Sequence, residues 1–187
     1  MSKFRPGPFS VGVRDIEHRP GEMREKSFDV TIRERWGEGL VTIPANSPIA
    51  IDVRLESVHE GILVTGDAEA TYEGECGRCL TEIAERVEVE FQELFAYPGS
   101  EANDFEVQDD HVDLETLVRD GLVLALPFQP VCRPDCPGLD PETGRRLADG
   151  ETSTAPADPR WAALAGLSSE LESTEDIPSD HDGAPRA

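Results

Sequence analysis

The sequence predicts an α+β protein with an antiparallel β-rich core, either a curved sheet or a partial barrel, one main amphipathic helix, a cysteine-rich loop and a short C-terminal helix. Three observations lead to this prediction. Several segments alternate apolar and polar side chains with a period of two, as half-buried strands do. One later segment has the apolar spacing of a helix. Two close cysteine pairs, Cys76 with Cys79 and Cys132 with Cys136, lie before and after that helical segment.

Alternating side chains predict the strands in order. A first strand includes Phe28, Val30 and Ile32 and ends near Trp36-Gly37, and a shorter one runs from Leu40 to Ile43. Residues 49–55 and 62–72 form a convincing antiparallel hairpin around the turn His59-Glu60-Gly61. After the first cysteine pair, residues 83–91 form another strand, which Tyr97-Pro98-Gly99 ends, and Phe105 and Val107 predict a short edge strand.

The helical segments have recognisable starts and stops. Asp113 is the predicted N-cap of the main helix, and Pro127 ends it. Its apolar face consists of Leu114, Leu117, Val118, Gly121, Leu122 and Ala125. A second, short helix is predicted at 158–171, with Asp158 as cap and Pro159 at its first position.

These elements predict the organisation of the chain. We expect an N-terminal arm (1–25), a β-rich core with the helix and both cysteine pairs (26–147), a linker (148–157), a short docked helix (158–171) and a disordered tail (172–187).

The charge is unevenly distributed along the 187 residues, whose formal net charge is −22. Residues 1–36 carry eight basic and six acidic side chains, whereas 37–187 carry nine basic and thirty-three acidic ones. The large negative charge of residues 37–187 disfavours generic binding of nucleic acid and favours binding of a basic protein partner. Solubility alone also explains such a charge. No apolar run approaches the roughly 18 residues of a membrane span, so we expect a cytoplasmic protein with reduced cysteines.

The four cysteines allow three interpretations. Two pairs brought together by the fold would give a tetrahedral zinc site formed by Cys76, Cys79, Cys132 and Cys136. A redox pair is less favoured, because strands flank Cys76 and Cys79 and no helix N-terminus lowers their pKa. The third interpretation is four reduced, buried thiols. Arg78 would either stabilise thiolate charge or be a solvated cation on a turn.

No catalytic motif stands out in the sequence. The four histidines, His18, His59, His111 and His181, are scattered without a metal-ligand spacing. No glycine-rich phosphate loop or nucleophile elbow is present, so the sequence predicts neither an enzyme nor a small-molecule substrate.

Several separated motifs resemble the YceD-type large ribosomal RNA subunit accumulation proteins over roughly residues 10–170. They are Val13-Arg14-Asp15-Ile16, Arg19-Pro20-Gly21, Glu75-Cys76-Gly77-Arg78-Cys79-Leu80, Val112-Asp113-Leu114, residues 124–139 and Asp158-Pro159-Arg160-Trp161. The resemblance implies a cytoplasmic, non-enzymatic factor required for normal levels of large-subunit ribosomal RNA. Many relatives carry a further Cys-Pro-x-Cys-Gly motif where this chain has Asp140-Pro141-Glu142-Thr143-Gly144. If the family's metal shell used those later sulfurs, this chain has lost half of it.

The leading hypothesis is a factor for large-subunit ribosomal RNA accumulation and ribosome assembly. Its acidic body would bind a basic ribosomal protein, and Arg14, Arg19, Arg24 and Lys26 would contact precursor ribosomal RNA. Two alternatives remain: a ribonuclease-like processing enzyme and a thiol-based stress sensor acting through Cys76 and Cys79.

Overall fold

The structure is a computed structural model that describes residues 4–99, 105–151 and 160. The chain divides into two compact units, Met1–Gly138 and Leu139–Ala187, and each is described by itself. The predicted helix at 158–171, except Arg160, and the predicted tail at 172–187 lie outside the described residues. The predicted domain boundaries therefore remain predictions.

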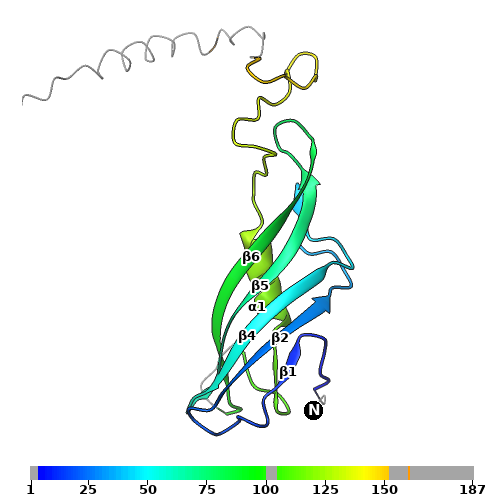
Figure 1. The fold of residues 1–187 in the computed structure, drawn as a ribbon. Helices are drawn as coiled ribbons and strands as arrows, with labels where there is room; N and C mark the ends of the chain where they lie inside the picture. The colour runs from blue at the N-terminus through cyan, green and yellow to red at the C-terminus, as the bar shows by residue number, and fades with distance from the viewer. Residues whose placement is uncertain (1–3, 100–104, 152–159, 161–187) are drawn as a thin grey trace, which may run out of the picture. The chain divides into compact units, whose positions relative to one another are not determined.

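A twisted antiparallel sheet dominates the first unit (Figure 1). Its strands lie in the order β2 (Met23–Thr31), β4 (Pro48–Ser57), β5 (Gly61–Glu75) and β6 (Glu82–Ala96). Every neighbouring pair is antiparallel, and β2 and β6 form the two edges. The fold-class prediction is confirmed: the described core is mostly antiparallel sheet with one helix, and the sheet does not close into a barrel.

The hairpin of β5 and β6 extends beyond the other strands, as Figure 1 shows. Strand β4 pairs with the first half of β5, up to Glu69, and the short strand β3 (Val41–Thr42) pairs with Glu73 and Gly74 further along. A Cβ atom on Gly74 would lie 2.0 Å from the carbonyl oxygen of Leu40, so only glycine lets β3 approach this closely. The first cysteine pair lies at the tip of this hairpin.

One face of the sheet is buried, as the alternation in the sequence predicts. On this face β4 and β5 contribute side chains that are at most 4% exposed, namely Ile49, Ile51, Val53, Leu55, Ile62, Val64, Ala68 and Ala70. Helix α1 (Glu115–Ala125) packs on this side against β6 and β5 and buries Val118 and Leu122. The opposite face carries the polar residues of the same strands.

A second, two-stranded sheet was not predicted from the sequence. Strand β1 (Ser10–Gly12) pairs with β7 (His111–Asp113), which directly precedes α1. Val11 and Val112 at the centre of this pair are fully buried. Each strand has only three residues, too short a stretch for an alternating pattern, so the sequence alone gave no signal for it.

Three predicted details are wrong. The first strand ends at Thr31 and not near Trp36-Gly37, because Trp36 forms only an isolated bridge with Ile43. The N-cap of α1 is Leu114, whose side chain makes no capping hydrogen bond, because β7 continues through Asp113. Asp113 instead accepts a hydrogen bond of 3.2 Å from the amide of Glu115. The edge strand expected at Phe105 and Val107 is a single bridge between Glu106 and Ala96.

Candidate metal centre

The four cysteines that are far apart in the sequence come together in the first unit. Cys76 and Cys79 lie in the turn between β5 and β6, whereas Cys132 and Cys136 lie in the segment after α1. All four sulfur atoms lie within 4.8 Å of one another. Cys76, Cys79 and Cys136 are buried, and Cys132 is the most exposed of the four. The cluster could therefore bind a metal ion.

The distances between the sulfurs suit tetrahedral zinc. The Sγ atoms of Cys76 and Cys136 are 3.9 Å apart, and those of Cys79 and Cys132 are 3.6 Å apart. Four sulfurs placed about 2.3 Å from a central zinc ion are about 3.8 Å from one another. A disulfide requires a separation of about 2.05 Å, and none of the four cysteines forms one. The donor set therefore fits zinc by number, chemistry and spacing.

Hydrogen bonds in the first turn favour a thiolate at Cys76. The amide of Arg78 donates to its sulfur at 3.4 Å. Burial raises the pKa of the Cys76 thiol, but hydrogen bonds from the backbone of Cys132, Cys79 and Arg78 outweigh burial and lower this pKa to about 6. The hydroxyl of Thr81, 3.1 Å from the sulfur of Cys79, lowers the pKa of the Cys79 thiol.

In the absence of a cation, the second cysteine pair favours the protonated thiol. Burial and the neighbouring thiols raise the pKa of Cys132 to about 12, and burial also raises the pKa of Cys136. Four negative charges so close together repel one another, so all four thiols do not ionise unaided. A divalent metal ion removes this conflict, because metal ligands bind as thiolates and release their protons.

The backbone holds the two turns in register. The amide of Gly77 donates to the carbonyl oxygen of Pro130 at 2.8 Å, which fixes the segment after α1 against the hairpin tip. Arg78 donates from one guanidinium nitrogen to the carbonyl oxygens of Pro134 and Cys136, each at 3.1 Å. Arg78 is therefore a clamp between the two cysteine segments. From the sequence we expected Arg78 either to stabilise thiolate charge or to be solvated. The roles of Thr81 and Pro130 were not predicted, because neither residue belongs to a recognisable motif.

The turn at Asp140, in the second unit, has the same backbone pattern as the turn at Cys76. In the first turn, the amide of Cys76 donates to the carbonyl oxygen of Thr81 at 2.8 Å, and the amide of Leu80 donates to the carbonyl oxygen of Cys76 at 2.9 Å. In the second turn, the amide of Asp140 donates to the carbonyl oxygen of Arg145, and the amide of Gly144 donates to that of Asp140, both at 2.8 Å. Leu80 and Gly144 both have positive φ angles, 55° and 67°.

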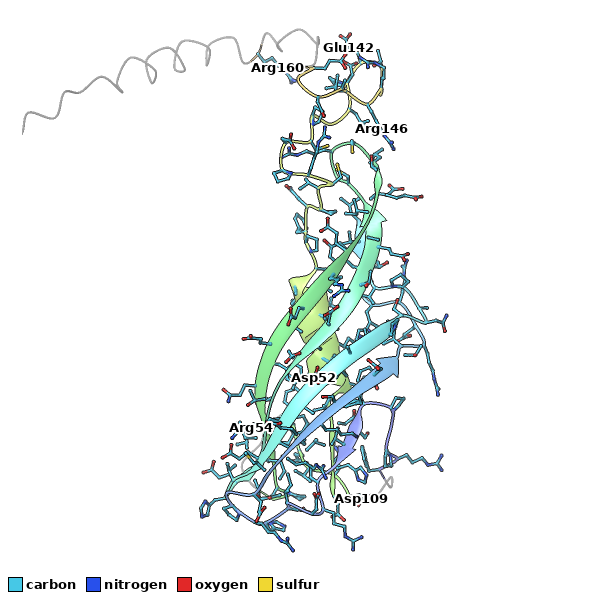
Figure 2. The ribbon with its side chains drawn as sticks, viewed as in Figure 1. Asp52, Arg54, Asp109, Glu142, Arg146 and Arg160 are labelled. Carbon is cyan, nitrogen blue, oxygen red and sulfur yellow. The ribbon has the colours of Figure 1, made fainter. Side chains whose placement is uncertain are left out.

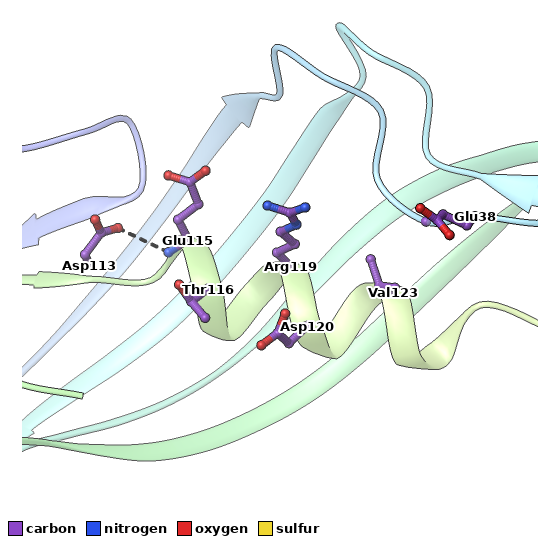
Figure 3. Close-up of a pocket in the computed structure, with 8 residues that line it drawn as sticks. Glu38, Asp113, Glu115, Thr116, Arg119, Asp120 and Val123 are labelled. Carbon is purple, nitrogen blue, oxygen red and sulfur yellow. Dashed lines mark hydrogen bonds between the residues drawn. The ribbon is translucent and has the colours of Figure 1, made fainter. Parts of the chain in front are cut away.

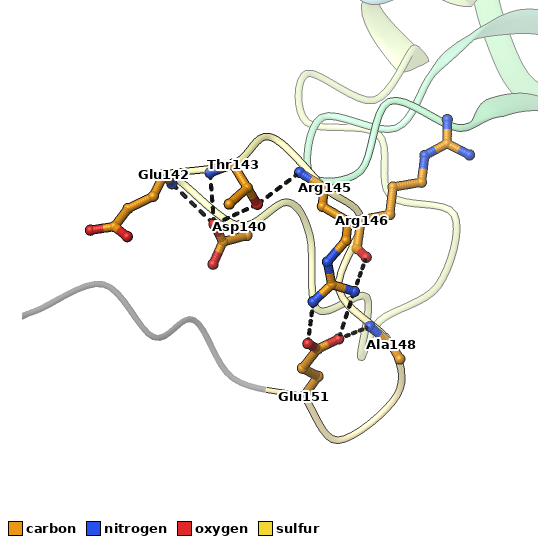
Figure 4. Close-up of polar contacts among 7 residues, drawn as sticks. All are labelled: Asp140, Glu142, Thr143, Arg145, Arg146, Ala148 and Glu151. Atoms are coloured by element: carbon orange, nitrogen blue, oxygen red, sulfur yellow. Dashed lines mark hydrogen bonds and ion pairs between the residues drawn. The ribbon is translucent and has the colours of Figure 1, made fainter.

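Side-chain hydrogen bonds take the place of sulfur in this second turn (Figure 4). The hydroxyl and the amide of Thr143 each donate to Oδ1 of Asp140 at 2.8 Å, and the guanidinium of Arg145 pairs with Glu151. Internal hydrogen bonds hold this turn, and Asp140 uses its carboxylate to close it.

We expect the Asp140 turn to weaken in acid. Hydrogen bonds from the Thr143 side chain and amide lower the pKa of Asp140 below its usual value of about 3.9. The contribution of this carboxylate is fully present above pH 4 and is lost as the pH falls through the lowered pKa. NMR titration of the Thr143 and Gly144 amides should give a midpoint below 3.9, and Asp140→Asn should remove the transition. A midpoint at or above about 3.9 would contradict the hydrogen-bonded geometry.

A surface hollow of about 620 Å³ lies beside α1 (Figure 3). It is lined mainly by charged side chains, and its one cation, Arg119, is 3.9 Å from Glu34. Its lining residues are Gly37, Glu38, Asp113, Glu115, Thr116, Arg119, Asp120 and Val123. The lining contains no histidine or cysteine, and its acidic side chains are those of a solvated helix face. We therefore take the cysteine cluster, and not this hollow, as the candidate site.

The fold and the cluster define a β-sheet protein whose hairpin tip and post-helix segment meet in a four-cysteine site. No helix among the described residues has the length and apolar character needed to cross a membrane. The family model for the large ribosomal RNA subunit accumulation protein YceD matches residues 64–168, which include all four cysteines. The chain belongs to the YceD family.

Relatives in mycobacteria extend the similarity beyond the region matched by the family model. Proteins of Mycobacterium bovis and Mycobacterium tuberculosis, both described as uncharacterized, are 42% identical over 168 residues, which cover 86% of this chain and 81% of each relative. An uncharacterized protein of Mycobacterium leprae is 37% identical and is covered to 77%. No solved structure matches the chain.

Proposed function

We propose that this protein is a non-enzymatic, cytoplasmic factor that supports accumulation of large-subunit ribosomal RNA and assembly of the large ribosomal subunit. It does so by binding a basic ribosomal protein, precursor ribosomal RNA or both. Membership of the YceD family, whose description names this accumulation, is the observation that carries the proposal. The four cysteines hold a structural zinc ion that ties the segment after α1 to the β5–β6 hairpin.

The exposed face of the sheet supports a basic partner. Asp52 pairs with Asp67, which pairs with Glu90, so three carboxylates form one row across β4, β5 and β6. In the next row Glu69 lies opposite Glu88. Figure 2 shows Asp52 and Arg54 on this part of β4. These rows lie on the face opposite α1.

Such rows reduce the stability of the free protein. Like charges directly opposite each other on neighbouring strands destabilise a sheet. Arg86 offsets part of this repulsion through its ion pair with Glu69 at 3.0 Å. Lysine or arginine side chains of a partner would relieve the rest, which gives the surface a preference for basic polypeptides.

The N-terminal cations differ in their availability for RNA. Arg24 forms a bidentate ion pair with Asp15, at 2.7 and 2.9 Å, and also donates to the carbonyl oxygen of Gly12. It therefore fastens the segment after β1 to β2. The side chain of Arg14 is 88% exposed, and its ion pair with Asp110 is longer, at 3.6 Å. Arg14 is therefore the better candidate for a phosphate contact.

Co-purification tests the proposed function. A tagged chain isolated from growing cells is expected to retain a ribosomal protein or precursor of the large-subunit RNA, and depletion should lower large-subunit RNA relative to small-subunit RNA. A charge-reduced variant, Asp52→Asn with Asp67→Asn, should retain less of the protein partner because the carboxylate row is weakened. Recovery of neither partner, together with unchanged RNA levels on depletion, would refute the proposal.

Two other functions remain hypotheses. Cleavage of precursor RNA by the purified chain would support the ribonuclease-like alternative. Reversible oxidation at Cys76 and Cys79 under mild peroxide would support a thiol sensor.

A further inference from the structure

The outer edge of β6 is open along most of its length. All 15 residues of β6 pair with β5 in an uninterrupted register. On the other side of β6, the described part of the chain contributes one bridge only, from Glu106 to Ala96. Figure 1 shows β6 as the outermost strand of the sheet.

The bridge at Ala96 reveals which backbone groups point outward. The amide of Ala96 donates to Phe105 at 3.0 Å, and its carbonyl oxygen accepts from Val107 at 2.9 Å, so both groups point away from β5. In an antiparallel pair this direction alternates from residue to residue. The backbone groups that share the outward direction in the open part of β6 are those of Ala84, Arg86, Glu88, Glu90 and Gln92. This segment measures about 30 Å, enough for a complete added strand.

The edge of β6 is protected against strand addition by charge alone. Natural proteins protect edges with charged side chains, especially lysine, with proline or with a bulge. Strand β6 contains no lysine, proline or glycine, and its register has no bulge. The other edge is different: on β2, Lys26 lies 4.7 Å from the ring centre of Phe28, and Arg24 is bound to Asp15. The two edges are therefore not equivalent.

Charge decides which strand this edge accepts. Strand β6 carries five glutamates and one arginine. Pairing with β6 of a second copy would bring the two sets of glutamates together, which is unfavourable. Residues 152–187 of the chain contain seven acidic and two basic side chains, so they are repelled as well. A strand rich in lysine or arginine is attracted, whereas the RNA backbone is not.

The buried face adds an apolar component. Val89 and Phe91 of β6 are only partly buried against the core. The side chains of an added strand would alternate between the two faces of the sheet. One set would lie beside Val89 and Phe91, and the other set beside Glu88 and Glu90. An alternating basic and apolar segment satisfies both faces.

We propose that the outer edge of β6, residues 84–92, binds an extended lysine- or arginine-rich segment of a partner protein as an additional β-strand. Main-chain hydrogen bonds supply affinity in this mode, and the alternate side chains supply specificity. The inference deepens the proposed function by assigning the binding mode of the basic partner, and it rests on that function for the partner's ribosomal identity.

A proline on β6 provides a sharp test. In Glu88→Pro the lost amide points away from β5, so the ladder between β5 and β6 keeps its hydrogen bonds. The probe is a peptide of about nine residues that alternates lysine and valine. The full-length chain should bind it with protection of the Arg86, Glu88 and Glu90 amides from hydrogen exchange. Glu88→Pro should weaken binding at least about tenfold, since it removes a main-chain donor and obstructs the neighbouring strand.

Two variants provide controls. Ser27→Pro places a proline on the opposite edge of the sheet, on β2. The amide and carbonyl groups of Ile32 form hydrogen bonds with Ser47 and Asn46, on the side of β4. Because this direction alternates along a strand, the amide of Ser27 points away from β4. This variant should bind the peptide like the wild type. Glu88→Gln removes charge but keeps the amide, and should weaken binding less than Glu88→Pro does. Circular dichroism and thermal melting confirm that each variant is folded.

The outcomes separate this inference from the proposed function. Equal binding by Glu88→Pro and wild type, or protection confined to β2 or to the acidic face, would overturn edge binding. Tighter binding of a single-stranded RNA probe than of the peptide would also overturn it. If a folded Glu88→Pro variant still retains ribosomal partners from cells, the proposed function stands and the edge inference fails. If the peptide protects the β6 amides but cells yield no ribosomal partner, the edge inference stands and the proposed function fails.

Discussion

Substitution Cys76→Ser is expected to abolish zinc binding and to free the segment after α1 from the β5–β6 hairpin. The wild-type chain should carry about one zinc ion, and the variant less than about 0.1 by elemental analysis, because a hydroxyl is a poor replacement for a thiolate. The amide of Gly77, which donates to Pro130 at 2.8 Å, should then exchange faster with solvent. The main sheet should remain folded, since its core does not depend on the cluster.

The turn at Asp140 offers the control for this experiment. Asp140→Ala should leave the zinc content unchanged, because four sulfurs already complete a tetrahedral shell. Wild-type protein without zinc after expression in zinc-replete medium, or full zinc retention in Cys76→Ser, would refute the assignment. Zinc loss in Asp140→Ala would indicate that the second turn takes part in the site.

Substitution Phe95→Ala is expected to give a large loss of global stability. Phe95 is 1% exposed, and its ring centre lies 5.2 Å from that of Phe105, which it packs against near the end of β6. Truncating a fully buried phenylalanine typically costs about 3–5 kcal/mol through lost transfer energy and the remaining cavity. Urea unfolding followed by circular dichroism should show this reduction in the free energy of unfolding.

Phe128 provides the matched control. It is 92% exposed in the segment after α1, so Phe128→Ala should change the free energy of unfolding by less than about 0.5 kcal/mol. A loss of similar size in both variants would mean that Phe128 is covered by structure that its exposure does not reveal. A negligible loss in Phe95→Ala would contradict the packing of the core.

Local patterns were sufficient to predict the main strands and the helix. In β4 and β5 the alternation of Val53, Leu55 and Ala68 with charged neighbours matches one buried and one exposed face. The pairing of β1 with β7 could not be predicted, because three residues carry no periodicity and Val11 and Val112 meet only after the chain has folded back. The same limit explains the error of one residue at the N-terminus of α1.

For the candidate site, the sequence by itself identified the four thiols, their pairing along the chain and the family that carries them, because these depend on residue type and short spacing. Only the tertiary structure decided that the pairs meet, since Cys79 and Cys132 come together through the β5–β6 hairpin and the return of α1 along it. The role of Arg78 likewise follows only from its contacts with the second cysteine segment. The open edge of β6 is recognised only because the described residues pair with it at a single bridge. Spacing is a local property of the chain, whereas convergence and exposure depend on long-range packing.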